Sequence, residues 1–297
     1  MGFMQEWVMA TRPWSYTAAA VPILAGTAYA WWMGNTLHIG LFLLTVLGAI
    51  LFQTSLNLLN TYGDFKKGVD TFESAVTCPQ LVTGQISPEN MYRAGIISLV
   101  ITMAIGFYLV YATGPWVLFF GAIGVLGTYG YTTGPRPYKY IGLGSMLVFF
   151  LMGPFMTAPA YYIQTLSFDW GCFLIAAPIC FWVSAILHAN DLRDITHDQN
   201  AHIQTLAIWL KRDRSIHHYI GLCVGAIAST IILVFFQVVP ITALLPLLLL
   251  WKIGRICRRL LKAPDTIILP LESITAKLHF EYGALWSIGI AVGILVT

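Results

Sequence analysis

The chain has 297 residues, of which 58% are hydrophobic and only 10% are charged, and its mean hydropathy is +0.74. Soluble domains carry about 25% charged residues, so this composition excludes an ordinary soluble globular protein and predicts an integral membrane protein. The net charge is a small +3, and no segment carries a nucleic-acid-binding signature, so we expect no nucleic-acid partner.

Nine apolar segments are predicted to cross a bilayer as α-helices, since a transmembrane helix needs about 20 mostly apolar residues. They lie near residues 15–33, 39–60, 91–112, 116–133, 141–162, 168–189, 217–239, 241–261 and 279–297. The segments are continuous rather than alternating, which favours helices over the strands of a barrel. The predicted fold is therefore all-α, with residues 1–297 forming a single integral membrane domain. We expect no cleavable signal peptide, because the first apolar run lacks a small-residue cleavage site.

The basic residues predict the orientation of the bundle. When the sides alternate along nine helices, all 16 Lys and Arg residues fall on one side, and the positive-inside rule makes that side cytoplasmic. The amino terminus is then predicted inside the cell and the carboxyl terminus outside. Twelve of the 13 acidic residues lie on the cytoplasmic side, and only Asp169 lies on the other.

Two similar polar motifs follow the second and the sixth predicted helices. The first reads Asn60-Thr-Tyr-Gly-Asp64 and the second reads Asn190-Asp191-Leu-Arg-Asp194. Both have the form N-x3-D, and the offset is 130 residues for the Asn and for the final Asp. Because the two helices are four apart in order, the pattern predicts two pseudo-repeated four-helix halves plus one extra helix, with the motifs facing each other.

Helical spacing places the polar side chains of each motif on one face, since residues three, four and seven apart are neighbours on a helix. The residues concerned are Asn57, Asn60 and Asp64 in the first motif and Asp191, Asp194 and Asp198 in the second. Carboxylates that point the same way at a membrane interface repel each other unless a cation neutralises them. Carboxylate and amide oxygens suit Mg²⁺, which shares its remaining positions with water and substrate phosphates.

Two aspartate motifs around Mg²⁺ imply a diphosphate, and their place at the mouth of a lipid-facing bundle implies an isoprenyl tail lying between the helices. The metal and basic groups would stabilise the departing pyrophosphate, and aromatic ring faces could stabilise the allylic cation. Simple solvated helix caps and a cation-coupled transporter are the alternatives. Transporter acids usually lie at bilayer depth, whereas these lie at helix ends, which favours an enzyme.

Five stretches, in chain order, carry a family resemblance. They are TRPWSYTAAAVPILAGTA from Thr11, NLLNTYGDFKKGVDT, GYTTGPRPYKYIGLG, NDLRDITHDQNAHIQTLA and ITAKLHFEYGAL. Together they resemble the UbiA superfamily of intramembrane prenyltransferases, and within it the MenA-type 1,4-dihydroxy-2-naphthoate polyprenyltransferases of menaquinone biosynthesis. The resemblance implies nine helices around a central cavity and Mg²⁺-dependent transfer of a polyprenyl group from a prenyl diphosphate to an aromatic acceptor. It also implies a bacterial or archaeal inner membrane, with the active site on the cytoplasmic side.

The resemblance also implies roles for single residues. The expected metal ligands are Asn60, Asp64, Asp70, Asp191, Asp194 and Asp198, and the five aspartates among them form the expected catalytic set. The residues expected to contact substrate are Asn57, Asn60, Arg136, Lys139 and Asn190. Of these, Arg136 and Lys139 lie in the loop after the fourth helix, where basic groups could hold the diphosphate.

The sequence departs from this family pattern at two places. His202-Ile203-Gln204-Thr205 stands where such proteins usually have Gly-Lys-Arg-Thr, and Gln80 stands where the first loop often carries an Arg. Both aspartate motifs are intact, but cationic groups that would hold diphosphate or an acidic acceptor are missing. Two alternatives therefore stay open, a UbiA-type terpene cyclase and a prenyltransferase with a different acceptor. In each case the expected partners are lipid-soluble substrates and membrane lipid.

Overall fold

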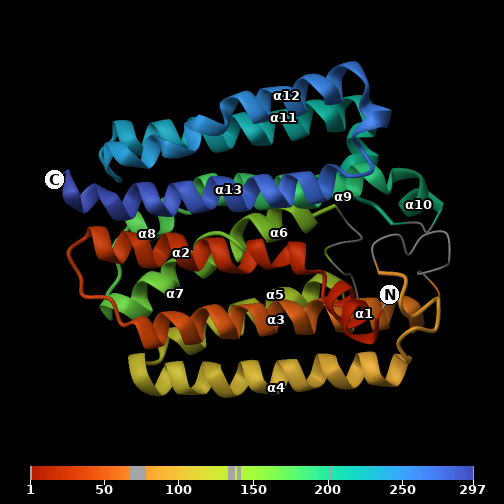
Figure 1. Ribbon diagram of the computed structural model, residues 1–297, viewed down its shortest axis with the longest axis horizontal. Helices are drawn as coiled ribbons and strands as arrows, with labels where there is room; N and C mark the ends of the chain where they lie inside the picture. The colour runs from red at the N-terminus through yellow and green to blue at the C-terminus, as the bar shows by residue number, and fades with distance from the viewer. Residues whose placement is uncertain are drawn as a thin grey trace.

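A computed structural model describes residues 2–66, 68, 78–132 (the backbone alone at 128–132), 138, 142–200 and 203–296. This part of the chain is all-helical and contains no β-strand, as the sequence predicts. Its long helices run side by side along one axis (Figure 1). The helices are α1 (Phe3–Ala10), η1 (Pro13–Ser15), α2 (Tyr16–Trp32), α3 (Ile39–Lys66), α4 (Pro88–Thr113), α5 (Trp116–Thr132), α6 (Gly144–Leu151), α7 (Pro154–Thr165), α8 (Gly171–Leu174), α9 (Ala177–Arg193), α10 (Ile195–Asn200), α11 (Leu206–Phe235), η3 (Ile241–Leu249), α12 (Leu250–Lys262), η4 (Pro264–Thr266), α13 (Leu271–Val292) and η5 (Gly293–Leu295).

Six helical segments of the described chain are long and apolar enough to cross a membrane, which confirms an integral membrane protein. They are Ile39–Lys66, Pro88–Thr113, Gly144–Thr165, Gly171–Arg193, Leu206–Phe235 and Leu271–Leu295. Three further predicted spans correspond to α2, α5 and η3 with α12, which do not meet this test of length and composition. The total of nine crossings therefore stays a prediction.

Three predicted spans are interrupted where glycine or proline disturbs the helix. The fifth is divided into α6 and α7 around Gly153 and Pro154, and the sixth into α8 and α9 just before Pro178. The eighth begins as the 3₁₀-helix η3, which contains Pro246. Proline lacks the backbone N–H that an α-helix needs in its interior, so each interruption has a local cause. At Gly153 a side chain would also collide with Cys180 of α9, so the glycine permits close packing there.

Helix α13 lies at the centre of the packing. It contacts α2, α9 and η3, while α2 also packs on α7, α9 on α11, and α3 on α4 (Figure 1). One hydrophobic core surrounds the fully buried Trp286 of α13, and a second, shared by α9, α11, α12 and α13, surrounds Trp182 of α9. A smaller cluster beneath α1 contains Leu58 and Met91. Packing between buried side chains of neighbouring helices therefore stabilises the bundle.

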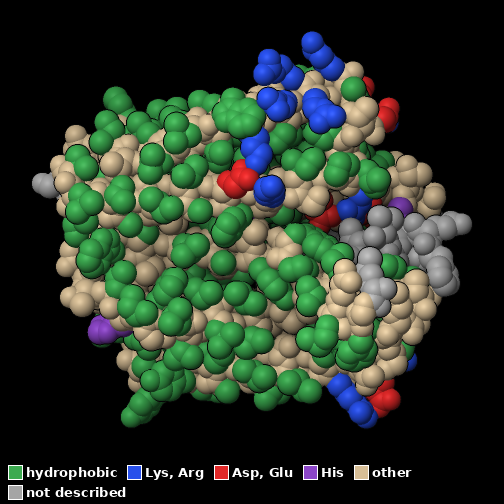
Figure 2. All heavy atoms as spheres, in the orientation of Figure 1, with side chains coloured by type: hydrophobic (Ala, Val, Ile, Leu, Met, Phe, Trp, Pro, Cys, Tyr) green, Lys and Arg blue, Asp and Glu red, His purple; other side chains and the backbone are tan. Residues whose placement is uncertain are grey.

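Both polar motifs lie at the same end of the bundle. The end of α3, the end of α9 and α10 lie together there, opposite the C terminus (Figure 1). Figure 2 shows that the Lys and Arg side chains visible on this face gather toward that end, and that none is visible around the C terminus. This arrangement places the two motifs at the same end of the bundle. The division of the bundle into two repeated halves stays a prediction.

Candidate functional site

Helix α3 carries the first motif on one face, as the sequence predicts. The helix continues to Lys66, so Asn57, Asn60 and Asp64 are spaced by three and four residues on unbroken helix. Asn57 is buried, whereas Asn60 and Asp64 in the last two turns are partly exposed. The polar face therefore becomes accessible toward the helix end.

Asn57 connects α3 to the chain segment before α2. Its side-chain amide donates hydrogen bonds to the carbonyl of Thr11 (2.7 Å) and to Oγ of Ser15 (2.8 Å). Its Oδ1 accepts a bond from Nε2 of Gln53 (3.2 Å). The first two contacts give Asn57, which the sequence places among the substrate-binding residues, a structural role in fixing the Thr11–Ser15 segment.

Arg12 also lies at this polar end, although the sequence analysis did not place it in the site. Its guanidinium donates a hydrogen bond to Oγ1 of Thr61 (3.1 Å), which lies between Asn57 and Asp64 on α3. Its Nε is buried and has no hydrogen-bond partner in the described chain. The backbone has φ 53° and ψ 63°, a left-handed conformation that is uncommon for a non-glycine residue. The sequence signal was the Arg-Pro pair just before the first apolar run.

The second motif departs from the expected single helical face. Helix α9 ends at Arg193, Asp194 caps it, and Asp198 lies on the separate short helix α10. The prediction that Asp191, Asp194 and Asp198 share one face assumed an uninterrupted helix, and it was wrong at this point. The backbone N–H of Asp198 still donates to the carbonyl of Asp194 (2.8 Å), so α10 stays close to the end of α9. Asp191 and Asp198 are both buried.

Arg193 organises the end of α9. Its guanidinium donates to Oδ1 of Asn190 (2.7 Å) and to both carboxylate oxygens of Asp194 (2.7 and 2.6 Å). It also donates to Glu272 of α13 (2.5 Å), and the side chains of Arg193 and Glu272 are only 11% and 18% exposed. The network balances the charge of Asp194 and ties the second motif to the last long helix.

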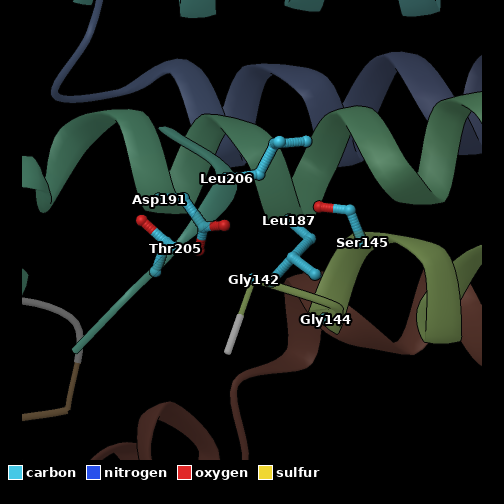
Figure 3. A pocket seen from close by; sticks show the side chains of 7 residues that line it. All are labelled: Gly142, Gly144, Ser145, Leu187, Asp191, Thr205 and Leu206. Atoms are coloured by element: carbon cyan, nitrogen blue, oxygen red, sulfur yellow. The ribbon is translucent and has the colours of Figure 1, made fainter. Parts of the chain in front are cut away.

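A small cavity of about 10 Å³ adjoins Asp191 (Figure 3). Its lining residues are Gly142, Gly144, Ser145, Leu187, Asp191, Thr205 and Leu206. The carboxylate of Asp191 and the hydroxyl of Ser145 lie on different sides of this space (Figure 3), and Oγ of Ser145 is buried without a hydrogen-bond partner in the described chain. A space of this size holds about one water molecule.

The described residues alone do not form a compact acidic metal cluster. No group of three or more His, Cys, Asp or Glu side chains among them is placed to hold a metal ion. Three predicted site residues, Asp70, Arg136 and Lys139, lie outside the described residues. The donor set nevertheless suits Mg²⁺, which takes only one or two protein carboxylates per ion and completes its shell with water and phosphate oxygens.

A large apolar cavity of about 610 Å³ lies among α2, α3, α4, α5, α6 and α7. Among the described residues that line it, the polar side chains are Thr45, Gln53 and Thr102. Large side chains of α4 and α5 that line it, such as Phe107 (60% exposed) and Val125 (54% exposed), also reach the outer surface. The cavity therefore opens sideways, toward the region where lipid would surround the bundle.

Helix α3 joins the cavity to the polar end. Thr45, Ala49 and Gln53 line the cavity, and Gln53 donates a hydrogen bond to Asn57 one turn further along the helix. Asn57, Asn60 and Asp64 then share one face, because they are spaced by three and four residues. The helix therefore leads from a dry cavity to a polar end, the arrangement that a molecule with an apolar tail and an anionic head requires.

Comparison with known proteins identifies the family. The chain matches the UbiA prenyltransferase family over residues 19–266. It is 30% identical over 241 residues to the 1,4-dihydroxy-2-naphthoate octaprenyltransferase of Bacillus subtilis, which covers 77% of each chain. It is 28% identical over 293 residues to the protein of the same name from Escherichia coli, which covers 96% of this chain and 95% of that one.

Solved structures show the same fold at lower sequence identity. A UbiA homolog from Archaeoglobus fulgidus bound to GPP and Mg²⁺ is 17% identical, with a TM-score of 0.61 over 95% of this chain and 99% of that one. A UbiA homolog from Aeropyrum pernix K1 in its apo form is 14% identical, with a TM-score of 0.67 over 95% of this chain and 98% of that one. These likenesses bear out the predicted UbiA-like helical architecture.

Proposed function

Because this chain belongs to the UbiA prenyltransferase family, it is a prenyltransferase, and we propose that it joins a polyprenyl group to 1,4-dihydroxy-2-naphthoate in menaquinone biosynthesis. The names of the relatives from Bacillus subtilis and Escherichia coli support this acceptor. The observation that carries the proposal is the hydrogen bond from Gln53, which lines the apolar cavity, to Asn57, which precedes Asn60 and Asp64 by one and two turns on α3. A polyprenyl diphosphate needs both a polar head site and a dry channel.

The diphosphate head is assigned to the two motifs at the cytoplasmic surface. The proposed Mg²⁺ ligands are Asn60, Asp64, Asp70, Asp191, Asp194 and Asp198. Bound Mg²⁺ would neutralise the charge that develops on the departing diphosphate. Arg193 would orient the carboxylate of Asp194 through its hydrogen bonds, since metal-ligating carboxylates are themselves oriented by such bonds. Asp191 and Asp198 are both buried, and this burial would limit the access of bulk water to the proposed metal ligands.

Three cationic side chains complete the proposed head site. Arg136 and Lys139 stay assigned to the diphosphate, and Arg12 joins them because its guanidinium already lies against Thr61 on α3. Charge-assisted hydrogen bonds from guanidinium to phosphate are among the strongest available to a protein. Left-handed backbone at a non-glycine residue such as Arg12 is typical of functional sites, and Asn57 fixes that segment from both sides.

The tail is assigned to the apolar cavity, with the reacting carbon near Phe52 and Gln53. Both residues line the cavity at the turn of α3 that precedes Asn57. In the proposed reaction, the bond between the first carbon of the prenyl chain and its diphosphate oxygen breaks, and the electron pair leaves with the diphosphate. The electron-rich ring carbon of the acceptor bonds to the allylic carbon, and the ring then loses a proton. The ring face of Phe52 can stabilise the transient cation, and the apolar lining excludes water that would trap it.

Product analysis tests the proposal. Purified full-length protein is given prenyl diphosphates of several lengths, Mg²⁺ and a panel of aromatic acceptors, and the products are identified by mass spectrometry together with the release of pyrophosphate. We expect a prenylated naphthoate and pyrophosphate release that depends on both acceptor and metal.

Each competing function predicts a different result in the same assay. A cyclic hydrocarbon formed without acceptor would identify a terpene cyclase. Efficient prenylation of a different aromatic compound, with none of 1,4-dihydroxy-2-naphthoate, would show that this other compound is the acceptor. Full turnover in excess EDTA without added metal would contradict the Mg²⁺ assignment. Absence of any pyrophosphate release from protein that is folded and embedded in lipid would overturn the proposed reaction.

A further inference from the structure

Helix α12 presents four basic side chains on one exposed face. Arg255, Arg258, Arg259 and Lys262 are spaced by three, four and seven residues and are all exposed. The opposite face of the helix contributes buried aliphatic side chains to the core shared with α9, α11 and α13. Figure 2 shows the corresponding cluster of Lys and Arg over α12, at the edge of the molecule. The helix is therefore amphipathic, with its basic face directed outward.

None of these four cations has an ion pair with an acid in the described chain, whereas several other basic groups are paired. Arg193 pairs with Glu272, and Arg212 pairs with Asp265, the acid that follows α12. Lys252 pairs with Glu281 of α13. It lies ten residues before the end of α12, which is about 15 Å along the helix axis at 1.5 Å per residue. The basic face of α12 therefore carries positive charge that no acid of the described chain neutralises.

Apolar side chains flank the basic face. Trp251 is 60% exposed and Leu261 is 52% exposed. The guanidinium of Arg255 lies 4.9 Å from the ring centre of Trp251, which holds the cation over a ring that the lipid can also reach. Trp at membrane interfaces and basic groups that extend toward lipid headgroups are the two features by which helices anchor to anionic membrane surfaces. A partner must therefore offer an anionic phosphate next to an acyl chain.

We infer that the basic face of α12 is a binding site for the headgroup of an anionic phospholipid, separate from the prenyl-transfer site. Each basic residue near a membrane surface strengthens such binding by about fivefold. Arg258 and Arg259 lie midway along the basic face, and both are exposed, so their replacement tests the site without removing a core side chain.

The test compares lipid binding to full-length protein in neutral phosphatidylcholine micelles. Phosphatidylglycerol is titrated in, and bound lipid is counted by native mass spectrometry while the unfolding temperature is recorded. We expect the R258Q/R259Q variant to bind phosphatidylglycerol at least about tenfold more weakly than wild type. The matched control R93Q/K277Q removes two exposed cations that lie outside α12, and it should bind within about twofold of wild type.

The remaining arms separate the possible ligands. Unfolding temperatures of all variants in phosphatidylcholine alone should agree, which excludes a folding defect as the cause. Added salt should weaken phosphatidylglycerol binding to wild type more than to R258Q/R259Q. Equal binding by wild type and R258Q/R259Q would overturn the inference, as would equal stabilisation by inorganic phosphate at the same concentration.

Discussion

Gln53 donates a hydrogen bond to Asn57 one turn further along α3, and this contact marks the boundary between the apolar cavity and the polar end of the bundle. Gln53 lines the cavity, whereas Asn57 holds the carbonyl of Thr11 and the hydroxyl of Ser15. The segment that carries Arg12 is thereby fixed at the same boundary. The proposed reaction should take place here, where an apolar tail would meet an anionic head.

Filling the cavity should shorten the prenyl chains that the enzyme accepts. Gly106, Gly121 and Gly124 line the cavity, and a Cβ atom added at each would meet no atom within 4 Å. Each Gly→Leu substitution should therefore fold normally but lower kcat/KM for the longest prenyl diphosphates by about 10- to 200-fold, the range for a small steric change in an apolar pocket. Competition assays with substrates of mixed length measure this effect.

The matched control for these variants is Gly221→Leu on α11, which also has open space around it but lies away from the cavity. It should keep the wild-type length profile. If the three cavity variants also keep that profile, the tail does not occupy this cavity.

Neutralising one acid in each motif should show that the motifs act as one site. Asp64→Asn and Asp194→Asn should each lower turnover at least about a hundredfold, because losing a charge-stabilising group in such a site typically costs a few kcal/mol. The double variant should lose less than the product of the two effects, since residues that act as a unit are not additive. Asp213→Asn, an exposed acid on α11, is the control. Turnover within about twofold of wild type in either single variant, at normal expression, would refute the two-motif site.

Arg12 should contribute to binding of the diphosphate. A hydrogen bond to a charged group is worth about 1.5–3 kcal/mol, so Arg12→Gln should lower kcat/KM for the prenyl diphosphate by about 10- to 150-fold. Arg12→Lys should recover part of this loss, because the ammonium keeps the charge but not the planar fork of donors. The readout is steady-state kinetics at saturating acceptor. Unchanged kinetics in Arg12→Gln would leave the residue with only its structural contact to Thr61.

The two arginine ion pairs at this end should differ in their effect on stability. Arg193 is 11% exposed and bonds three side chains, whereas Arg93 is 66% exposed and, within the described chain, pairs with Glu89 alone. Arg193→Gln should lower the free energy of unfolding by up to about 3 kcal/mol, because it leaves two partly buried carboxylates uncompensated. Arg93→Gln should lower it by about 0–1 kcal/mol. Denaturant unfolding in mixed micelles measures the free energy of unfolding of each variant. Equal decreases in the two variants would show that the Arg193 network contributes no more to stability than an exposed ion pair.

The predicted topology places the two termini on opposite sides of the membrane. Thr297→Cys should react with an impermeant maleimide in intact cells, whereas Gly2→Cys should react only after permeabilisation. The native cysteines are buried or, at Cys257, partly buried, so wild type sets the background. Labelling of Thr297→Cys only after permeabilisation would require an even number of crossings and would contradict the predicted orientation.

The sequence predicts those parts of the site that depend on local periodicity. The face of α3 from Asn57 to Asp64 follows from the spacing of residues on one helix, and the structure confirms it. Contacts between distant segments have no such signal. Arg12 meets Thr61 across 49 residues of sequence, and Arg193 meets Glu272 across 79. The helix break at Asp194 was also missed, because no glycine or proline marks it.

The Arg193–Glu272 pair also constrains how the protein matures. A chain leaves the ribosome with its N-terminal part first, so α9 is inserted well before α13, which carries Glu272. Until α13 docks, Arg193 has only the neighbouring Asn190 and Asp194 as partners from this network. A nascent or truncated chain that ends before Glu272 therefore lacks the contact that fixes the second motif. Completion of the head site is thus coupled to arrival of the last long helix, one of the final steps of synthesis.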